Sequence, residues 1–147
     1  MLKKFLILFT QQVEQEPLST ATVELATAAL MYEVVHADSS VDIAEEEKVK
    51  SLLREQFNID PVTLDALMQT GAENAKDAVD LVQFTRVLND NYTAEQRTDI
   101  LQKLWLVAYA DEYLDKHEEH IIRRIADLMH IPHSLFIQSK LKAIDSN

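Results

Sequence analysis

The chain has 147 residues, of which 47% are hydrophobic and 27% are charged, a composition that predicts one globular domain with a substantial core. Its formal net charge of −11 argues against a basic face for nucleic acid or anionic membranes and favours cations or basic protein surfaces as partners. The chain has no cysteine, which excludes disulfides, thiolate catalysis and cysteine-ligated metal sites.

The first segment is apolar but short. Lys3 and Lys4 precede an apolar run that ends at Thr10, too short for a signal peptide, and no small-residue cleavage site follows it. No segment approaches the roughly 20 apolar residues that a membrane-spanning helix needs. We therefore expect residues 1–18 to form an N-terminal helix of a cytoplasmic protein. This helix could cover the bundle or form a homodimer with a second subunit.

The rest of the chain also predicts helices. Gly71 is the only glycine, and a β-rich chain of this length would need more turn glycines. The sequence therefore predicts an all-α fold, a helical bundle of about seven to eight helices. Apolar residues at helical spacing place these helices, in chain order, at residues 2–15, 20–37, 43–57, 61–71, 77–89, 94–110, 116–129 and 132–143.

Helix-start signals recur along the chain. Three residue pairs have the spacing of a capping box, in which each side chain accepts a hydrogen bond from the backbone N–H of the other residue. These pairs are Asp42 and Glu45, Thr93 and Gln96, and Asp115 and Glu118. Pro61 and Pro132 occupy predicted first helical positions, where the missing N–H costs nothing.

The predicted core is drawn from residues at helical spacing: Leu25, Ala29, Tyr32, Leu52, Leu53, Leu104, Trp105, Val107, Ile121, Ile125 and Leu128. Trp105, Tyr109 and Tyr113 form a stripe that we interpret as core, with an aromatic interaction face as the alternative.

One pattern occurs twice. Residues 37–45 and 110–118 both read A-D-x-x-[VL]-D-x-x-E, and each copy joins two apolar helical segments. The similarity extends outward, so that residues 20–70 form a first repeat and residues 94–143 a second. We expect two pseudo-symmetric helical hairpins within a single domain that spans residues 1–147.

The acids of the two copies have different predicted roles. The second Asp of each copy is an N-cap candidate, and the Glu occupies the third helical position, at the positive end of the helix dipole. The first Asp follows the last turn of a helix, where its charge faces the negative end of that dipole. Amide donors of the turn could offset this repulsion, and so could a bound divalent cation. The acids are Asp38, Asp42 and Glu45 in the first copy, and Asp111, Asp115 and Glu118 in the second.

The cation hypothesis names Asp38, Glu45, Asp111 and Glu118 as metal ligands, with Asp42 and Asp115 as secondary ligands. Such an all-oxygen site suits Ca²⁺ or Mg²⁺, whereas Zn²⁺ would want a nearby nitrogen. The pattern is not an EF-hand, because it lacks the alternating acids and the central glycine. His117 and His120 lie three residues apart on one predicted helix and are a separate metal candidate. His36 is not part of the repeated pattern, because its counterpart is Tyr109.

The paired A-D-x-x-[VL]-x-x-x-E segments between amphipathic helices resemble those of the tellurite-resistance protein B (TerB) and TerB-like family, over about residues 20–140. The resemblance implies an all-α domain of such hairpins, with an acidic cluster at these loops that is proposed to bind metal ions or partner proteins. It also implies a role in bacterial tellurite resistance or stress response. The family usually has glycine after the first Asp of each copy, where this chain has Ser39 and Glu112.

We therefore expect a non-catalytic TerB-like module whose paired acidic loops bind a divalent cation or a basic protein partner. The spacing of the residues predicts no nucleophile–base arrangement, and the chain has no glycine-rich phosphate loop. Two alternatives stay open. Clustered carboxylates can act as acid and base in a metal-dependent enzyme, or the acids can cap helices in a purely structural or adaptor domain.

Overall fold

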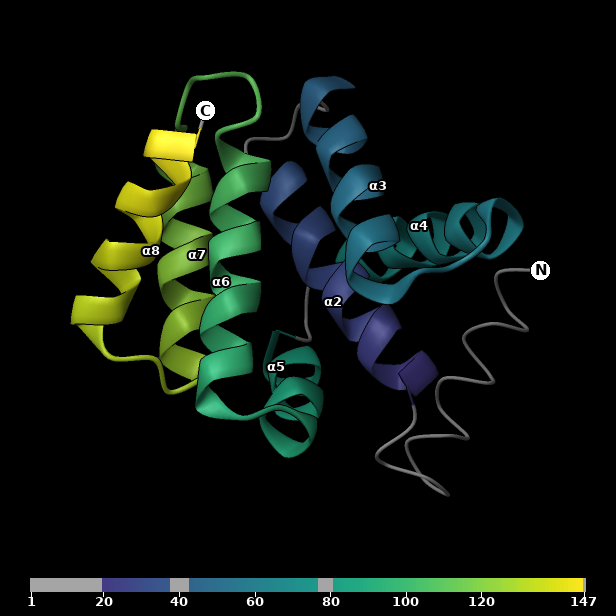
Figure 1. Ribbon diagram of the computed structural model, residues 1–147, viewed down its shortest axis with the longest axis horizontal. Helices are drawn as coiled ribbons and strands as arrows, with labels where there is room; N and C mark the ends of the chain where they lie inside the picture. The colour runs from purple at the N-terminus through teal and green to yellow at the C-terminus, as the bar shows by residue number, and fades with distance from the viewer. Residues whose placement is uncertain (1–19, 38–42, 77–80, 147) are drawn as a thin grey trace.

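Seven α-helices make up the part of the chain that the computed structural model describes, residues 20–37, 43–76 and 81–146 (Figure 1). They are α2 (Thr20–Val35), α3 (Ile43–Phe57), α4 (Pro61–Lys76), α5 (Leu81–Asn91), α6 (Ala94–Ala108), α7 (Lys116–Leu128) and α8 (His133–Ser146). The described residues contain no strand, which confirms the predicted all-α fold. None of these helices is long and apolar enough to cross a membrane. The predicted helix 2–15, and with it the homodimer hypothesis, lies outside the described residues.

The largest difference from the predicted helix ends is at Gly71. The sequence predicted that a helix ends there, whereas α4 continues through Gly71 to Lys76. A glycine inside a helix costs about 1 kcal/mol relative to alanine, and the residues that follow include two alanines, which are the best helix formers. A smaller difference is at Pro132. Helix α8 begins one residue later, and the Pro132 carbonyl accepts from the N–H of Phe136 at 3.0 Å.

Side-chain caps fix two of the helix starts. Thr93 and Gln96 form the predicted capping box of α6, with a 3.2 Å bond to Thr93 Oγ1 and a 2.9 Å bond to Gln96 Oε1. Pro61 begins α4 as predicted, and Asp60 Oδ1 accepts from the N–H of Thr63 at 2.8 Å. Both starts follow from short-range sequence signals.

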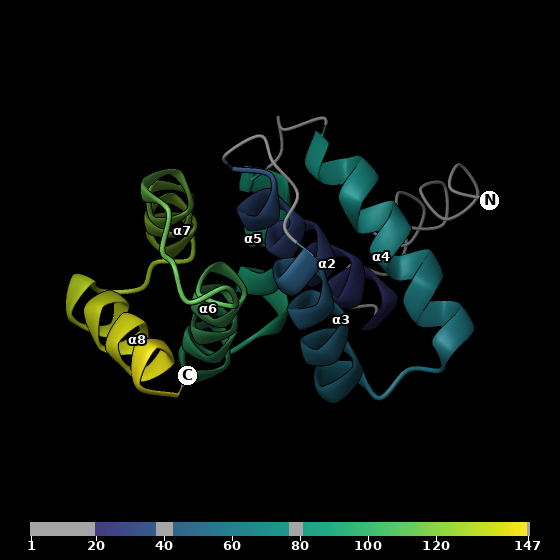
Figure 2. The ribbon, with the colours of Figure 1, turned by 90° about the horizontal axis from the view of Figure 1, so that it is seen from above.

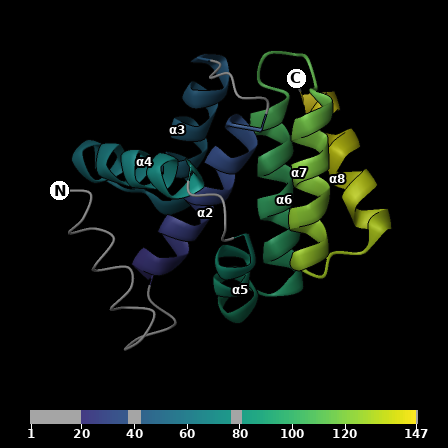
Figure 3. The same cartoon turned by 180° about the vertical axis from the view of Figure 1, so that it is seen from behind.

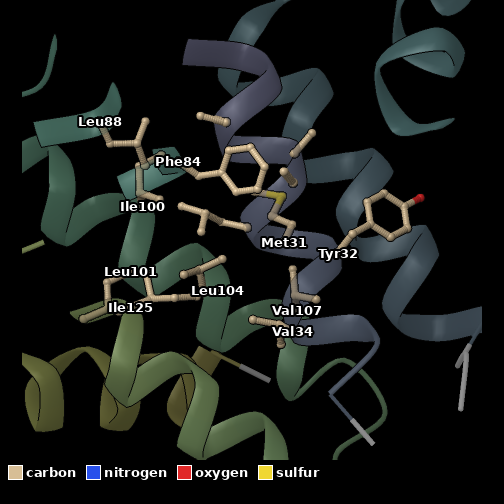
Figure 4. Close-up of a cluster of buried hydrophobic side chains, with 14 of the residues drawn as sticks. Met31, Tyr32, Val34, Phe84, Leu88, Ile100, Leu101, Leu104, Val107 and Ile125 are labelled. Carbon is tan, nitrogen blue, oxygen red and sulfur yellow. The ribbon is translucent and has the colours of Figure 1, made fainter. Parts of the chain in front are cut away.

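The core is built around α2, in which every side chain from Leu25 to Val35 is buried. Figure 4 shows Val34 of α2 beside Val107 of α6, at the contact between the two halves of the bundle. Most of the predicted core is buried, including Leu104 and Trp105. Ile121 and Leu128 are only half-buried and pack against the edge of the core.

The contacts between helices follow the sequence repeat. Helix α2 packs most extensively on α4, and α6 packs on α8 in the same way. Likewise α3 contacts α6 while α7 contacts α2, and α2 and α6 contact each other. Figure 2 shows α3 and α4 on one side of α2, and α6, α7 and α8 on the other. Exchanging the two repeats therefore preserves these contacts, as expected for pseudo-symmetric hairpins. Helix α5 belongs to neither hairpin and contacts α2, α6 and α7 (Figure 3).

Candidate functional site

The described parts of both acidic copies lie at the same end of the bundle. The C-terminal end of α2, the first turn of α3 and the connection 109–115 between α6 and α7 are all at the top of Figure 1. Both helices that precede a copy end in the same way, because the N–H groups of Ala37 and Ala110 each donate to the carbonyl three residues back, at 3.2 Å. This tightening ends α2 and α6 two residues before the predicted ends. Asp38 and Asp42 lie outside the described residues.

Asp115 caps α7, as the sequence predicted. Its Oδ1 accepts from the backbone N–H of His117 at 2.7 Å and lies 3.1 Å from Nδ1 of the same residue. The N–H group of His117 lowers the pKa of the Asp115 carboxyl below its ordinary value. Glu118 Oε1 accepts from the N–H of Asp115 at 3.3 Å and completes the capping box. The Asp115 carboxylate is thus bound to the first turn of α7, and the Glu118 carboxylate is bound to the backbone of the N-cap residue.

Glu45 and Glu118 occupy the third positions of α3 and α7, and both are buried, with exposed fractions of 3% and 1%. The sequence predicted their helical position but not their burial. At this position the positive end of the helix dipole stabilises the carboxylate. A ligand that reached either glutamate would therefore meet it below the surface, at the start of its helix.

Asp111, by contrast, is exposed. Its Oδ1 accepts from the N–H of Tyr113 at 3.0 Å, so an amide donor of the turn offsets part of the repulsion from the end of α6. Glu112 has a φ of 63°, in the left-handed region that favours glycine. The connection adopts this conformation here with a glutamate.

The candidate ligands therefore separate into two layers within the second copy, an exposed Asp111 and a buried, capping Glu118. Among the described residues, no group of three or more histidine or acidic side chains is placed to hold a metal ion. Asp38 and Asp42 belong to the predicted ligand set but lie outside the described residues, so this observation does not apply to them. His117 contacts Asp115, and His120 is exposed on α7.

The sequence did not reveal that two polar side chains at the end of α2 are buried, Glu33 and His36. Glu33 has an exposed fraction of 9%, and its Oε2 and the Nε2 of His36 are buried atoms without a hydrogen-bond partner in the described structure. Burial raises the pKa of Glu33 to about 7. The sequence signal that could have indicated this burial is that Glu33 lies in a mostly apolar helical segment. Glu24 is the only other charged residue of α2.

The three residues of the aromatic stripe become more exposed along the chain. Trp105 is fully buried, Tyr109 is half-buried, and Tyr113 is 68% exposed beside Asp111. The interpretation as core is therefore correct at the start of the stripe and wrong at Tyr113, because the chain has left α6 by that residue.

A cavity of about 870 Å³ lies apart from the acidic copies. It is bordered by the first half of α6, by the α5–α6 and α7–α8 connections and by part of α8, and Tyr92, Arg97, His130 and Leu135 are among the residues that line it. Its lining mixes acidic, basic and apolar side chains, so it favours no single ligand class.

The comparison with known families agrees with this architecture. The family model described as tellurite resistance protein TerB matches residues 24–141, which include all of α3 to α7. The chain belongs to the TerB family. The TerB match begins inside α2 and ends inside α8, so it spans both acidic copies and the α5 segment between the repeats. The comparisons with curated proteins and with solved structures found no match.

Proposed function

We propose that this TerB protein is a non-catalytic module of bacterial stress response or tellurite resistance that acts in the cytoplasm. Its paired acidic loops bind a divalent cation or a basic protein surface. The observation that carries the proposal is that the described parts of both acidic copies lie at one end of the bundle, in a chain of net charge −11.

Exposed carboxylates at this end support the proposal. Asp111, Glu112 and Glu47 are exposed, and Asp111 uses one oxygen, Oδ1, in its turn. Carboxylate oxygens are the ligands that Ca²⁺ and Mg²⁺ prefer in proteins, and a concentration of negative charge also attracts basic protein surfaces. Asp38, Glu45, Asp111 and Glu118 remain the proposed ligands, with Asp42 and Asp115 as secondary ones.

One observation favours a second candidate, a purely structural or adaptor domain. Asp115 and Glu118 form a capping box that accounts for both carboxylates without a ligand. The first Asp of each copy therefore distinguishes the two functions, because neither Asp38 nor Asp111 belongs to a predicted capping pair.

The test is calorimetric titration of the full chain with Ca²⁺ and Mg²⁺. Changing Asp38→Asn and Asp111→Asn together should abolish the heat of binding. Asparagine keeps an Oδ1 that can accept from the N–H of Tyr113, so the turn can form in the variant. The matched control is the double change Asp90→Asn and Asp127→Asn, which removes the same charge from exposed positions on α5 and α7 and should leave binding intact.

Titration with a lysine-rich peptide tests the basic partner. Binding of either the cation or the peptide that is lost only in the Asp38/Asp111 variant supports the module. If neither binds the wild-type protein, and the metal-free Asp38/Asp111 variant is clearly less stable than wild type, the acids are structural caps and the proposed function is wrong.

A further inference from the structure

Two donor atoms are buried where α2 ends, on Glu33 in its last turn and on His36, the residue that follows the helix and whose N–H donates to the Tyr32 carbonyl at 2.9 Å. Glu33 is nine-tenths buried, and His36 is half-buried with its ring stacked on Tyr32 at a centroid distance of 5.9 Å. Glu33 Oε2 and His36 Nε2 are both buried without a hydrogen-bond partner in the described structure. Buried polar atoms of this kind are rare in folded proteins, and each calls for a physical explanation.

The spacing of the two residues places them on one face of the helix. Side chains three positions apart in a helix have Cβ atoms roughly 5–6 Å apart. A carboxylate and an imidazole at this spacing can therefore reach a common ion, and helical bundles use the Glu-x-x-His arrangement to hold metals in their cores. Stacking on Tyr32 also restricts the orientation of the His36 ring.

This pair is not imposed by the repeat. In the second repeat, Leu106 and Tyr109 stand at the positions of Glu33 and His36. The equivalent place at the end of α6 therefore forms without a carboxylate or an imidazole. The acid and the histidine are a particular feature of the first repeat, so neither residue is needed to form the end of a repeat helix.

The energetics also favour a positive ligand. An ionised carboxylate in an apolar interior is costly unless it is paired, and burial alone raises the pKa of Glu33 to about 7. A cation bound between Glu33 and His36 would compensate the buried acid.

We propose that Glu33 Oε2 and His36 Nε2 bind a borderline divalent transition-metal ion, with Zn²⁺ as the best match to one oxygen and one nitrogen donor. Imidazole and carboxylate are both ordinary zinc ligands, and water completes the coordination because the described residues supply no third acidic or histidine side chain. The site differs in residues and in metal class from the all-oxygen site of the acidic loops.

The test is titration of the full, chelator-treated chain with Co²⁺ and with Zn²⁺. Co²⁺ gives visible absorption bands that change with its coordination geometry, and Zn²⁺ binding is measured by calorimetry and by the ring signals of His36 in NMR spectra. Wild type should bind both ions and should shift the His36 ring signals. Glu33→Gln and His36→Gln should each weaken binding by about tenfold or more.

Matched controls use exposed residues of the same types. Glu55→Gln on α3 and His133→Gln at the start of α8 should leave Zn²⁺ affinity and the Co²⁺ spectrum unchanged. The metal-free Glu33→Gln variant should unfold at or above the unfolding temperature of wild type, because the substitution removes a buried charge. Weaker metal binding by this variant could then not be explained by a folding defect. Loss of the His36 shift in a folded Glu33→Gln protein supports the site.

Two results would overturn the inference: no Zn²⁺ binding by wild type, or binding that survives both Glu33→Gln and His36→Gln. The Asp38/Asp111 variant separates this inference from the proposed function. It should keep the Zn²⁺ site while losing the Ca²⁺ or Mg²⁺ heat, so either claim can fail without the other. Zn²⁺ binding that is lost only in the Asp38/Asp111 variant would assign the metal to the acidic loops and refute the Glu33–His36 site.

Discussion

Asp115 shows how one side chain of the acidic pattern contributes to folding. Its carboxylate accepts from the first turn of α7, and Glu118 accepts from the Asp115 N–H in return. The repeat places Asp42 and Glu45 at the equivalent positions, and Glu45 is likewise buried at the start of α3. Both repeats can therefore carry an Asp and a Glu at these positions because the two residues stabilise the start of a helix, whether or not a ligand binds.

Asp115→Ala should lower the free energy of unfolding by about as much as Thr93→Ala, which removes the corresponding cap of α6. Because hydrogen bonding lowers the pKa of Asp115, its stabilising effect is present above about pH 4 and is lost as the pH falls through the folded-state pKa. Urea unfolding at neutral and acidic pH checks both points. Asp115→Asn, which keeps the acceptor oxygen, is the control. An alanine variant as stable as wild type at neutral pH would show that the cap contributes nothing.

Glu33→Gln should remove a pH dependence from the stability of the metal-free protein. Burial raises the folded-state pKa of Glu33 to about 7, against about 4.3 in an unfolded chain. Between these values the folded protein holds a proton that the unfolded chain has released. Wild-type stability should therefore decline by up to about 4 kcal/mol as the pH rises through this window, and then level off. Urea unfolding at a series of pH values measures the decline, and an equal decline in the variant would contradict the assignment to Glu33.

At the scale of the helices, the sequence predicted most of the architecture because its signals are local. Apolar spacing locates all seven described helices, and capping pairs such as Thr93 and Gln96 locate their starts. The continuation of α4 through Gly71 was missed, because the low helix propensity of one glycine is outweighed by the helix propensity of its neighbours. The burial of Glu45 and Glu33 was missed for another reason. It depends on contacts between helices, which spacing within one helix does not reveal.

Leu104 is a test of the core that joins the repeats. It is completely buried on α6, so Leu104→Ala should lower the free energy of unfolding by roughly 2–5 kcal/mol. Leu141→Ala on α8 is the matched control, since Leu141 is 55% exposed and its truncation should cost less than about 0.5 kcal/mol. Chemical denaturation of both variants measures the difference. Equal effects would mean that the buried face of α6 has been assigned wrongly.

A polar clamp holds the ends of three helices together. Asn89 on α5 donates to the Leu128 carbonyl of α7 at 3.0 Å, and it accepts from Arg97 of α6 at 3.1 Å. Asn89→Ala should therefore destabilise the protein by about 1–2 kcal/mol, because it leaves partly buried polar groups without this partner. Gln83→Ala on the exposed side of α5 should have almost no effect. A neutral Asn89→Ala variant in urea unfolding would refute the clamp.

At the scale of the whole molecule, the repeat explains why the described acidic segments lie together. Helices α2 and α6 contact each other and end at the same side of the bundle, so the chain that follows each helix leaves from one end (Figure 1). The sequence predicted two hairpins but not how they pack on each other. The structure shows that α3 of the first hairpin contacts α6 of the second, and that α7 of the second contacts α2 of the first. The separation of Asp111 at the surface from Glu118 in the interior could not be predicted, because both belong to one continuous acidic stretch.

Amide NMR spectra of the full chain, recorded during titration with Ca²⁺, Mg²⁺ or a lysine-rich peptide, test the central claim most directly. Binding at the acidic end should shift the signals of residues 109–118 and of the first turn of α3. The signals around Tyr92 and His130, which line the separate cavity, should stay in place. No shifts with any of these ligands, or shifts concentrated around that cavity, would contradict a binding site at the paired acidic loops.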